Sequence, residues 1–262
     1  MRKSKLEFPK IERYPVYAKI GDDYKDVKQD ALINPDNGKV YSIVSKKYTI
    51  LKHEEAYQMA KKLIEGLDWG EPEEKVFFEA DGARFWVKYR FDDMKIKVPN
   101  DGSDYTPYLL IGNSYDKFKS FSIRLGMYRW VCSNGLFLGE DISNVKRLHM
   151  PKPMMKGELN VVIKLIKKKA KIAVERNIEL WKQWMKEKIS RDEVEEMIEQ
   201  MKYVPDKMKE EIIWRFSKEV ATKFGLFMAV TYVISHMKYG RKYNISRQID
   251  YENMFSKMFY GK

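Results

Sequence analysis

The chain has 262 residues, which is enough to bury a large hydrophobic core in one domain or in a domain with an appendage. Its 50 lysines and arginines exceed its 38 aspartates and glutamates, and the net charge of +12 favours a polyanionic partner. No run of about 18 apolar residues is present and the first residues lead into no apolar signal core, so the sequence predicts a cytoplasmic protein (host cytoplasm if viral) with no membrane partner.

The aromatic residues favour one kind of polyanion. They make up 14% of the chain and can stack on the faces of unpaired bases, so the composition favours single-stranded nucleic acid, which we expect to be DNA. Abundant lysine, glutamate, isoleucine and tyrosine beside few glutamines is also typical of a thermophile.

Residues that bind metals or nucleotides are sparse. The single cysteine, Cys132, excludes an intrachain disulfide and a cysteine-built zinc site. The three histidines, His53, His149 and His236, are far apart and form no metal-binding pair. No Gly-x-x-x-x-Gly-Lys-Ser/Thr loop is present, which argues against an ATP-driven motor. We therefore expect no metal ion and no other cofactor.

The N-terminal half of the chain predicts a peripheral segment followed by a mixed core. Residues 1–40 are polar, and we expect them to form a peripheral N-terminal segment, irregular or lying outside the core. Residues 41–150 predict an α+β core, with a strand entering from residue 40, a helix over 56–67 and two β-hairpins between 76 and 125.

The C-terminal part predicts helices. Residues 151–262 form a helical region, with helices expected at 159–185, 192–202 and 205–236. The order strand, helix, sheet, helices predicts an α+β fold, in which an antiparallel β-hairpin sheet packs against helices and is followed by a helical C-terminal region.

The first hairpin carries the main candidate site. Asp81-Gly82 is a strong turn signal, and the strand that follows it alternates between two faces. We expect the face that carries Phe85 to be buried in the core. The other face combines cations with Trp86, which we expect to be exposed and able to stack on a base. The residues predicted to bind nucleic acid are Arg84, Trp86, Lys88, Arg90, Lys95, Lys97, Lys117, Lys119, Arg124 and Arg129.

Plainer interpretations remain open for these basic residues. Solvent-facing strands carry lysine and arginine to protect sheet edges from aggregation, which would explain the hairpin face without a ligand. For the lysines between 164 and 171, a solvated helix face is the explanation that we prefer over phosphate contact.

Two other function classes compete with strand binding. A metal-dependent nuclease needs an aspartate and a later Asp/Glu-x-Lys triplet on adjoining strands, which Asp81 and the triplet from Asp93 to Lys95 loosely offer. The hairpin turn and a strand end explain these aspartates equally well, so a catalytic role is not our main prediction. The third class is a structural or partner-binding protein of a mobile element.

Several motifs resemble those of the phage/plasmid-like family of uncharacterised proteins found in mobile elements. The similar segments are 108–116 (YLLIGNSYD) and 129–136 (RWVCSNGL), with weaker likeness at 44–48 (VSKKY), at His149 and at 225–231 (GLFMAVT). The resemblance spans about 41–236, and Met150 and Lys117 depart from the more usual threonine and glycine. It implies a mobile-element setting and assigns no mechanism.

The order of elements is also similar to the core of the Rad-type single-strand annealing proteins. That resemblance implies a homo-oligomer, a ring or a filament, in which the basic sheet holds the strand's backbone and leaves base edges free. Arg129 would join this surface or brace Asn134. The predicted function is therefore ATP-independent binding and annealing of single-stranded DNA in recombination of a virus or plasmid, without covalent chemistry.

Overall fold

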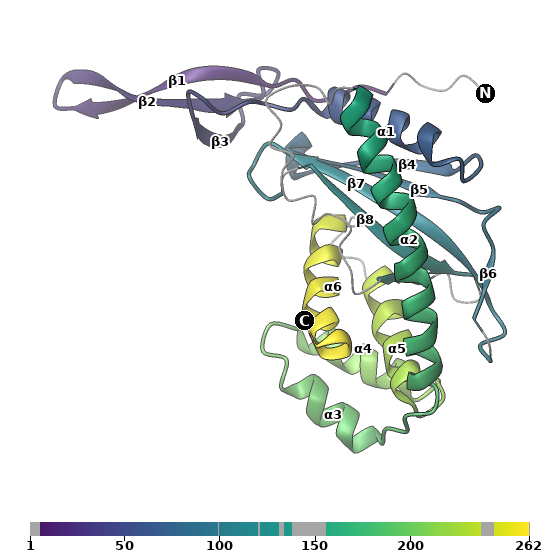
Figure 1. Ribbon diagram of the computed structural model, residues 1–262. Coiled ribbons are helices and arrows are strands. Elements are labelled where there is room, and N and C mark those ends of the chain that lie inside the picture. Colours follow the sequence, from purple (N-terminus) through teal and green to yellow (C-terminus); the bar gives the residue numbers. More distant parts are fainter. Residues whose placement is uncertain are drawn as a thin grey trace.

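A narrow β arm projects from a body built of one sheet and several helices (Figure 1). The computed structural model describes residues 6–98, 100–119, 121–130, 134–137, 156–236 and 244–261. Within these residues the strands form two antiparallel sheets, one in the arm and one in the body, and most helices lie toward the C-terminus. The predicted α+β fold is therefore confirmed.

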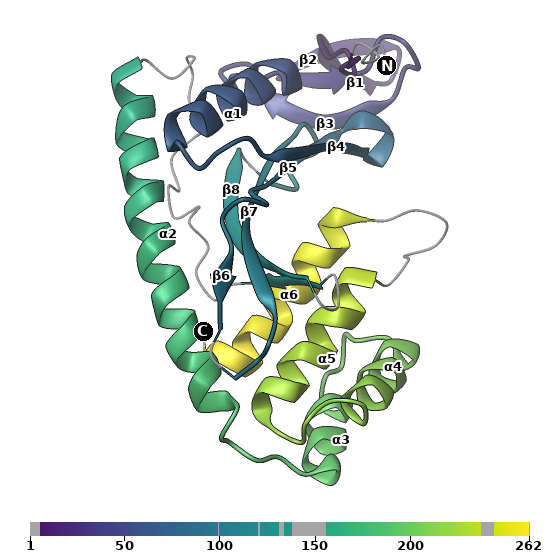
Figure 2. The same ribbon diagram turned by 90° about the vertical axis from the view of Figure 1, so that its right-hand side faces the viewer.

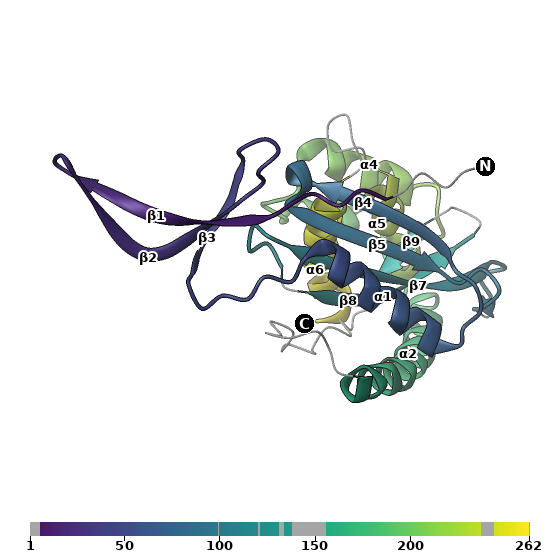
Figure 3. The ribbon, with the colours of Figure 1, turned by 90° about the horizontal axis from the view of Figure 1, so that it is seen from above.

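The arm is a three-stranded antiparallel sheet that extends away from the helices (Figure 3). Its outer half is exposed on both faces, so the strands lack the alternation of apolar and polar residues that reveals a half-buried strand. The prediction of an irregular N-terminal segment is wrong for this reason. The strands are β1 (Glu12–Ile20), β2 (Asp23–Ile33) and β3 (Val40–Ser45), of which β3 agrees with the predicted strand.

The base of the arm is fixed to the body. The Ser42 hydroxyl donates to the carbonyl oxygen of Tyr115 at 2.6 Å, and the Tyr41 ring stacks on the Tyr115 ring with centroids 5.9 Å apart. The Tyr41 hydroxyl also donates to the carbonyl of Asp81 at 2.7 Å. The inner end of β3 is thereby held while the outer half of the β1–β2 hairpin extends into solvent.

The body sheet has the order β4-β5-β7-β8-β9, with β6 pairing along β7. A short 3₁₀ turn, Ala80–Gly82, joins β4 to β5, and both Asp81 and Gly82 there have positive φ, as a tight hairpin connection requires. Both predicted hairpins are confirmed. The strands are β4 (Glu73–Glu79), β5 (Arg84–Arg90), β6 (Ile96–Lys97), β7 (Asp104–Ser114), β8 (Ser122–Arg129) and β9 (Asn134–Phe137).

Helices cover both faces of the body sheet (Figure 2). On one face lie α1 and the long α2; on the other lies α6, with α5 beside it and α3 and α4 further from the sheet. The helices are α1 (His53–Leu67), α2 (Lys156–Trp184), α3 (Arg191–Glu199), α4 (Asp206–Phe216), α5 (Lys223–His236) and α6 (Ile245–Tyr260).

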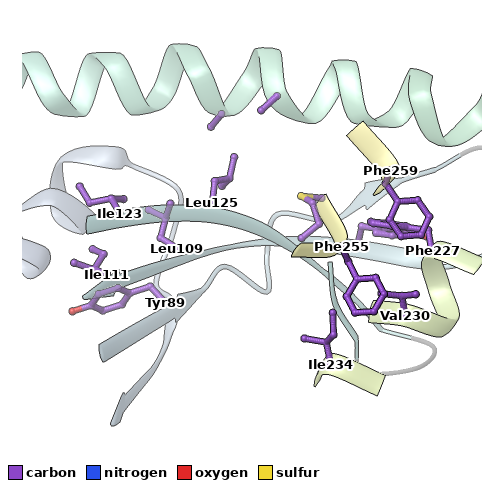
Figure 4. Close-up of a cluster of buried hydrophobic side chains, with 14 of the residues drawn as sticks. Tyr89, Leu109, Ile111, Ile123, Leu125, Phe227, Val230, Ile234, Phe255 and Phe259 are labelled. Atoms are coloured by element: carbon purple, nitrogen blue, oxygen red, sulfur yellow. The ribbon is translucent and has the colours of Figure 1, made fainter. Parts of the chain in front are cut away.

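One hydrophobic cluster connects the sheet with the C-terminal helices. Figure 4 shows buried side chains of the sheet, such as Leu109 and Ile123, below the long helix α2, and those of α5 and α6, such as Phe227 and Phe255, beyond them. Phe227 and Phe259 meet edge to face with centroids 5.0 Å apart. The core is therefore continuous from the sheet into the last two helices.

The predicted C-terminal helices differ from the structure at two places. The helix expected over 205–236 is two helices, α4 and α5, because residues 217–222 turn back and Thr222 pairs with Lys188. The Thr222 hydroxyl then accepts from the amide of Gly225 at 3.2 Å and caps α5. Residues 245–260 were expected only as part of the helical C-terminal region; they form a separate helix, α6, whose buried Ile245 and Ile249 stand one turn apart behind the capping side chain of Asn244.

Candidate nucleic-acid interface

The face of β5 that carries Trp86 and three cations lies beneath α6. Trp86 is only 1% exposed and packs with Ile245 and Ile249 of α6. Its ring lies over Gly112, its neighbour on β7, where an added Cβ would come within 2.2 Å of the ring. The prediction that Trp86 offers an exposed ring for base stacking is therefore wrong, because an unpredicted helix covers this face.

Glu79, the last residue of β4, fixes α6 in this position. Its carboxylate accepts hydrogen bonds from the amides of Ile245 and Ser246 and, at 2.5 Å, from the Ser246 hydroxyl. The Trp86 indole donates to the same carboxylate at 3.3 Å. A carboxylate at a helix N-terminus satisfies free amides and interacts favourably with the helix dipole. Glu79 therefore couples α6 to the covered face of the sheet.

The four arginines of the predicted surface each contact an acidic side chain. The Arg84 guanidinium lies 2.6 Å from the Asp116 carboxylate and 3.9 Å from the centre of the Phe118 ring. Because these charges are already balanced, a phosphate group would have to compete with a carboxylate at each of them. The other pairs are Arg90 with Glu73 and Asp92, Arg124 with Glu252, and Arg129 with Asp101.

The predicted lysines lie in different places. Lys88 is partly buried in a pocket between the sheet and α6, and Lys119 is half-buried in the loop between β7 and β8. Lys95, Lys97 and Lys117 are exposed. The structure therefore does not bring the ten predicted residues together on one open surface, and two of them, Lys95 and Lys97, stand beside an apolar groove.

That groove lies between α2 and the β6 edge of the sheet and has a volume of about 370 Å³. Trp69, just after α1, lines it and is braced edge to face by Phe91 at 5.1 Å. Along β6, Lys95 and Lys97 alternate with side chains of the lining, and Lys95 lies 4.0 Å from Asp104, the limit of an ion pair. Further apolar lining comes from Met94, Ile96, Leu125, Val174 and Ile178.

A row of exposed lysines follows α2 along the opposite rim. Lys164, Lys168 and Lys171 recur at helical spacing, and Lys167 and Lys171 also line the groove itself. In the part of the chain that the structure describes, no acidic group lies within 4.0 Å of these four ammonium groups. The sequence alone favoured an ordinary solvated face for this run, because the apolar groove beside it is not visible in the linear pattern.

The motif residues around position 113 form a structural network. The Asn113 amide lies 3.0 Å from His53 Nδ1 and donates to the carbonyl of Leu51 at 2.9 Å, while His53 Nε2 contacts the carbonyl of Gly82 at 3.0 Å. The Tyr115 ring stacks on His53 at 3.7 Å. Burial lowers the pKa of His53 to about 4, so the imidazole is neutral at physiological pH and joins α1 to the hairpin turn.

The two aspartates suggested for a nuclease do not share a site. Asp81 lies in the turn before β5 and Asp93 lies after its other end, which is about 20 Å away for a seven-residue strand. Asp81 pairs instead with Lys39 of the arm. Within the described ranges, no cluster of three or more histidine, cysteine, aspartate or glutamate side chains is arranged to hold a metal ion. Cys132 and His149 of the motifs lie outside the described residues.

The comparisons with known proteins identify a family without an assigned activity. A domain of unknown function, DUF932, matches residues 40–254. This agrees with the expected family of uncharacterised proteins and with the expected extent of the resemblance, while the mobile-element setting stays a prediction. No curated protein and no solved structure matches the chain. Among the helices that the structure describes, none is both long and apolar enough to span a bilayer.

Proposed function

Because this chain belongs to the DUF932 family, a domain of unknown function, we propose its function from its own residues: it binds single-stranded DNA along the groove between α2 and β6 and anneals it without ATP. The proposed partner, single-stranded DNA, is the one predicted from the sequence, but the proposed binding surface is different. It is the lysine row of α2 with the apolar groove beside it, because the predicted face of β5 is covered and ion-paired.

The observation that carries the proposal is the combination of unpaired lysines with an apolar groove. Four exposed ammonium groups with no acidic group within 4.0 Å in the described residues stand along one rim, and Lys97 stands along the other. Trp69 lies partly exposed in the lining between them. Proteins that bind single strands combine a positive track for phosphates with apolar or aromatic surfaces for bases, and the chain's net charge of +12 agrees with this partner.

Annealing follows from charge neutralisation and needs no reacting group. Two complementary strands repel each other through their phosphates, and a lysine row that neutralises one strand lowers that repulsion. The lysines from 164 to 171 span about 10 Å of helix, so they contact more than one phosphate and hold the strand extended. A groove of about 370 Å³ accommodates few bases at a time, which leaves the others free to pair.

The expected homo-oligomer is supported by the arm. Its outer half exposes Tyr17, Ile20 and Tyr24, each more than 50% accessible, on strands with no helix packed against them. Residues 12–30 carry five acidic and four basic side chains, so the arm lacks the excess of positive charge that would repel a second copy of this basic chain. A two-stranded ribbon is only marginally stable alone, and docking on a neighbouring copy would stabilise it. We therefore include in the proposal that copies of this chain assemble into a ring or a filament that acts in recombination of a virus or plasmid.

The direct test is fluorescence anisotropy with labelled single-stranded DNA, single-stranded RNA and duplex DNA over a range of salt. We expect single-stranded DNA to bind most tightly and affinity to fall by orders of magnitude between about 50 and about 200 mM salt. A second assay follows the pairing of two complementary labelled strands with and without ATP. Equal affinity for duplex and single strand, or pairing no faster than in buffer, would contradict the proposal. Addition of Mg²⁺ or Mn²⁺ to the same DNA would reveal cleavage if the chain were a nuclease.

A further inference from the structure

A second cavity lies on the other face of the sheet, between the strands and the N-terminal half of α6. It has a volume of about 310 Å³ and is lined by side chains of β4, β5, β7, β8 and α6. Apolar groups such as Phe77 and Leu110 form much of the wall, and a few polar groups converge inside. This size and composition are those of a small-molecule site.

Lys88 projects into this cavity without an acidic partner. Its Nζ lies 4.1 Å from the centre of the Tyr108 ring and 5.9 Å from that of Tyr128. Within the described residues, no carboxylate comes within 4.0 Å of it. Burial lowers the pKa of Lys88 to about 8, which indicates that the ammonium has lost much of its water and gained little in return.

The other charged groups around the cavity do not neutralise Lys88. On β4, the Glu73 carboxylate is engaged by Lys75 at 3.0 Å and by Arg90 at 2.7 Å. Lys75 is also the cross-strand neighbour of Lys88, so two like charges stand opposite each other. This arrangement costs stability unless an anion enters between the strands and the helix.

The acidic residue that α6 contributes to the cavity, Glu252, also has partners other than Lys88. Glu252 is buried, accepts from Gln248 at 2.9 Å and lies 3.5 Å from the Arg124 guanidinium of β8. Burial raises the pKa of Glu252, and the positive charge of Arg124 opposes that shift. The cavity is lined by three basic side chains, Lys75, Lys88 and Arg90, and by two acidic ones that are already ion-paired, so its excess positive charge lies at Lys88.

We propose that this cavity binds the phosphate monoester of a nucleotide-sized ligand, with Lys88 contacting the phosphate and the apolar wall contacting the planar base. A phosphate dianion balances Lys88 and reduces its repulsion from Lys75, whereas a neutral ligand does neither. The same phosphate group can come from a free nucleotide or from the 5′ end of a DNA strand. This cavity shares no lining residue with the groove along α2, so its ligand binding can be tested independently of strand binding in the groove.

The test compares deoxyadenosine monophosphate with deoxyadenosine by isothermal titration calorimetry. We expect the monophosphate to bind, and Lys88→Met to weaken it by roughly ten- to a hundredfold, the loss of one charge-assisted hydrogen bond. Lys202→Met, which removes an exposed lysine far along the chain, is the control and leaves the affinity unchanged. A DNA strand with a 5′-phosphate, compared with the same strand ending in 5′-hydroxyl, distinguishes the two sources.

A second measurement in the unaltered protein guards against misfolding of the variant. Lysines carrying isotope-labelled methyl groups report their surroundings by nuclear magnetic resonance, and the Lys88 signal is assigned by its absence in Lys88→Met. Addition of deoxyadenosine monophosphate shifts that signal if the proposal is correct. An unmoved Lys88 signal, or equal affinity of Lys88→Met and the unaltered protein for the monophosphate, overturns it.

Discussion

The lysine row of α2 gives the most quantitative prediction. Replacing Lys164, Lys167, Lys168 and Lys171 by glutamine removes four charges that have no acidic group within 4.0 Å in the described residues and lie on the helix surface, so the fold has little to lose. If each contacts one phosphate, the slope of log affinity against log salt becomes smaller by about 3, since each contact on a single strand contributes about 0.7. At about 0.1 M salt the same slope implies an upper limit of several hundredfold in lost affinity.

The assay is fluorescence anisotropy of a labelled single strand at several salt concentrations. The control carries the same loss of charge elsewhere: Lys186, Lys188, Lys202 and Lys207, all exposed, are replaced by glutamine. We expect the control to weaken binding slightly and to keep the slope. If both variants lose affinity equally, only net charge matters and the α2 row is not the contact surface. An unchanged slope in the α2 variant would show that these four lysines contact no phosphate.

Three further predictions concern stability. Because the pKa of buried His53 is lowered to about 4, the free energy of unfolding is highest above pH 6.5 and falls by up to about 3 kcal/mol toward pH 4. Urea titrations at several pH values should show this loss in the unaltered protein and in the control His236→Gln, but not in His53→Gln. Glu79→Gln should cost about 1–3 kcal/mol and speed amide exchange in α6, and unchanged exchange would contradict its capping role. Lys88→Met should stabilise the fold by about 1–2 kcal/mol at pH 7, which is less than the lowered pKa alone would give because Lys88 keeps some contact with water. The gain in stability should shrink from pH 8 to 10.5, and a variant less stable than the unaltered protein would contradict the absence of an acidic partner for Lys88.

Local patterns predicted the body of the fold. The turn at Asp81-Gly82 and the alternation after it identified β4 and β5, and the apolar spacing of residues 159–185 identified α2 almost to its ends. These signals are local because each element buries one regular face. The arm and α6 were not predicted as elements: the arm buries neither face along its outer half, and the 16-residue α6 lies beyond residue 236, where the last predicted helix ended.

The candidate site depended on information that no local pattern holds. The exposure of Trp86 was inferred from strand alternation, which shows that two faces differ but not what covers each. Likewise, ion pairs such as Arg129 with Asp101 join residues 28 positions apart, so composition alone could not show that the charges are balanced. The groove beside α2 combines residues from the loop after α1, from β6, β7 and β8 and from α2, and it appears only in three dimensions.

The measurement that tests strand binding in the groove most directly is photo-crosslinking of single-stranded DNA that contains bromodeoxyuridine, followed by mass spectrometry of the linked peptides. Photo-excited bromouracil reacts with aromatic side chains that it contacts, and Trp69 is the aromatic residue that lines the groove. We predict crosslinks to the peptide containing Trp69 that are lost in Trp69→Leu and at high salt. Crosslinks confined to the arm or to α3, α4, α5 and α6, with none at Trp69, would contradict strand binding in the groove.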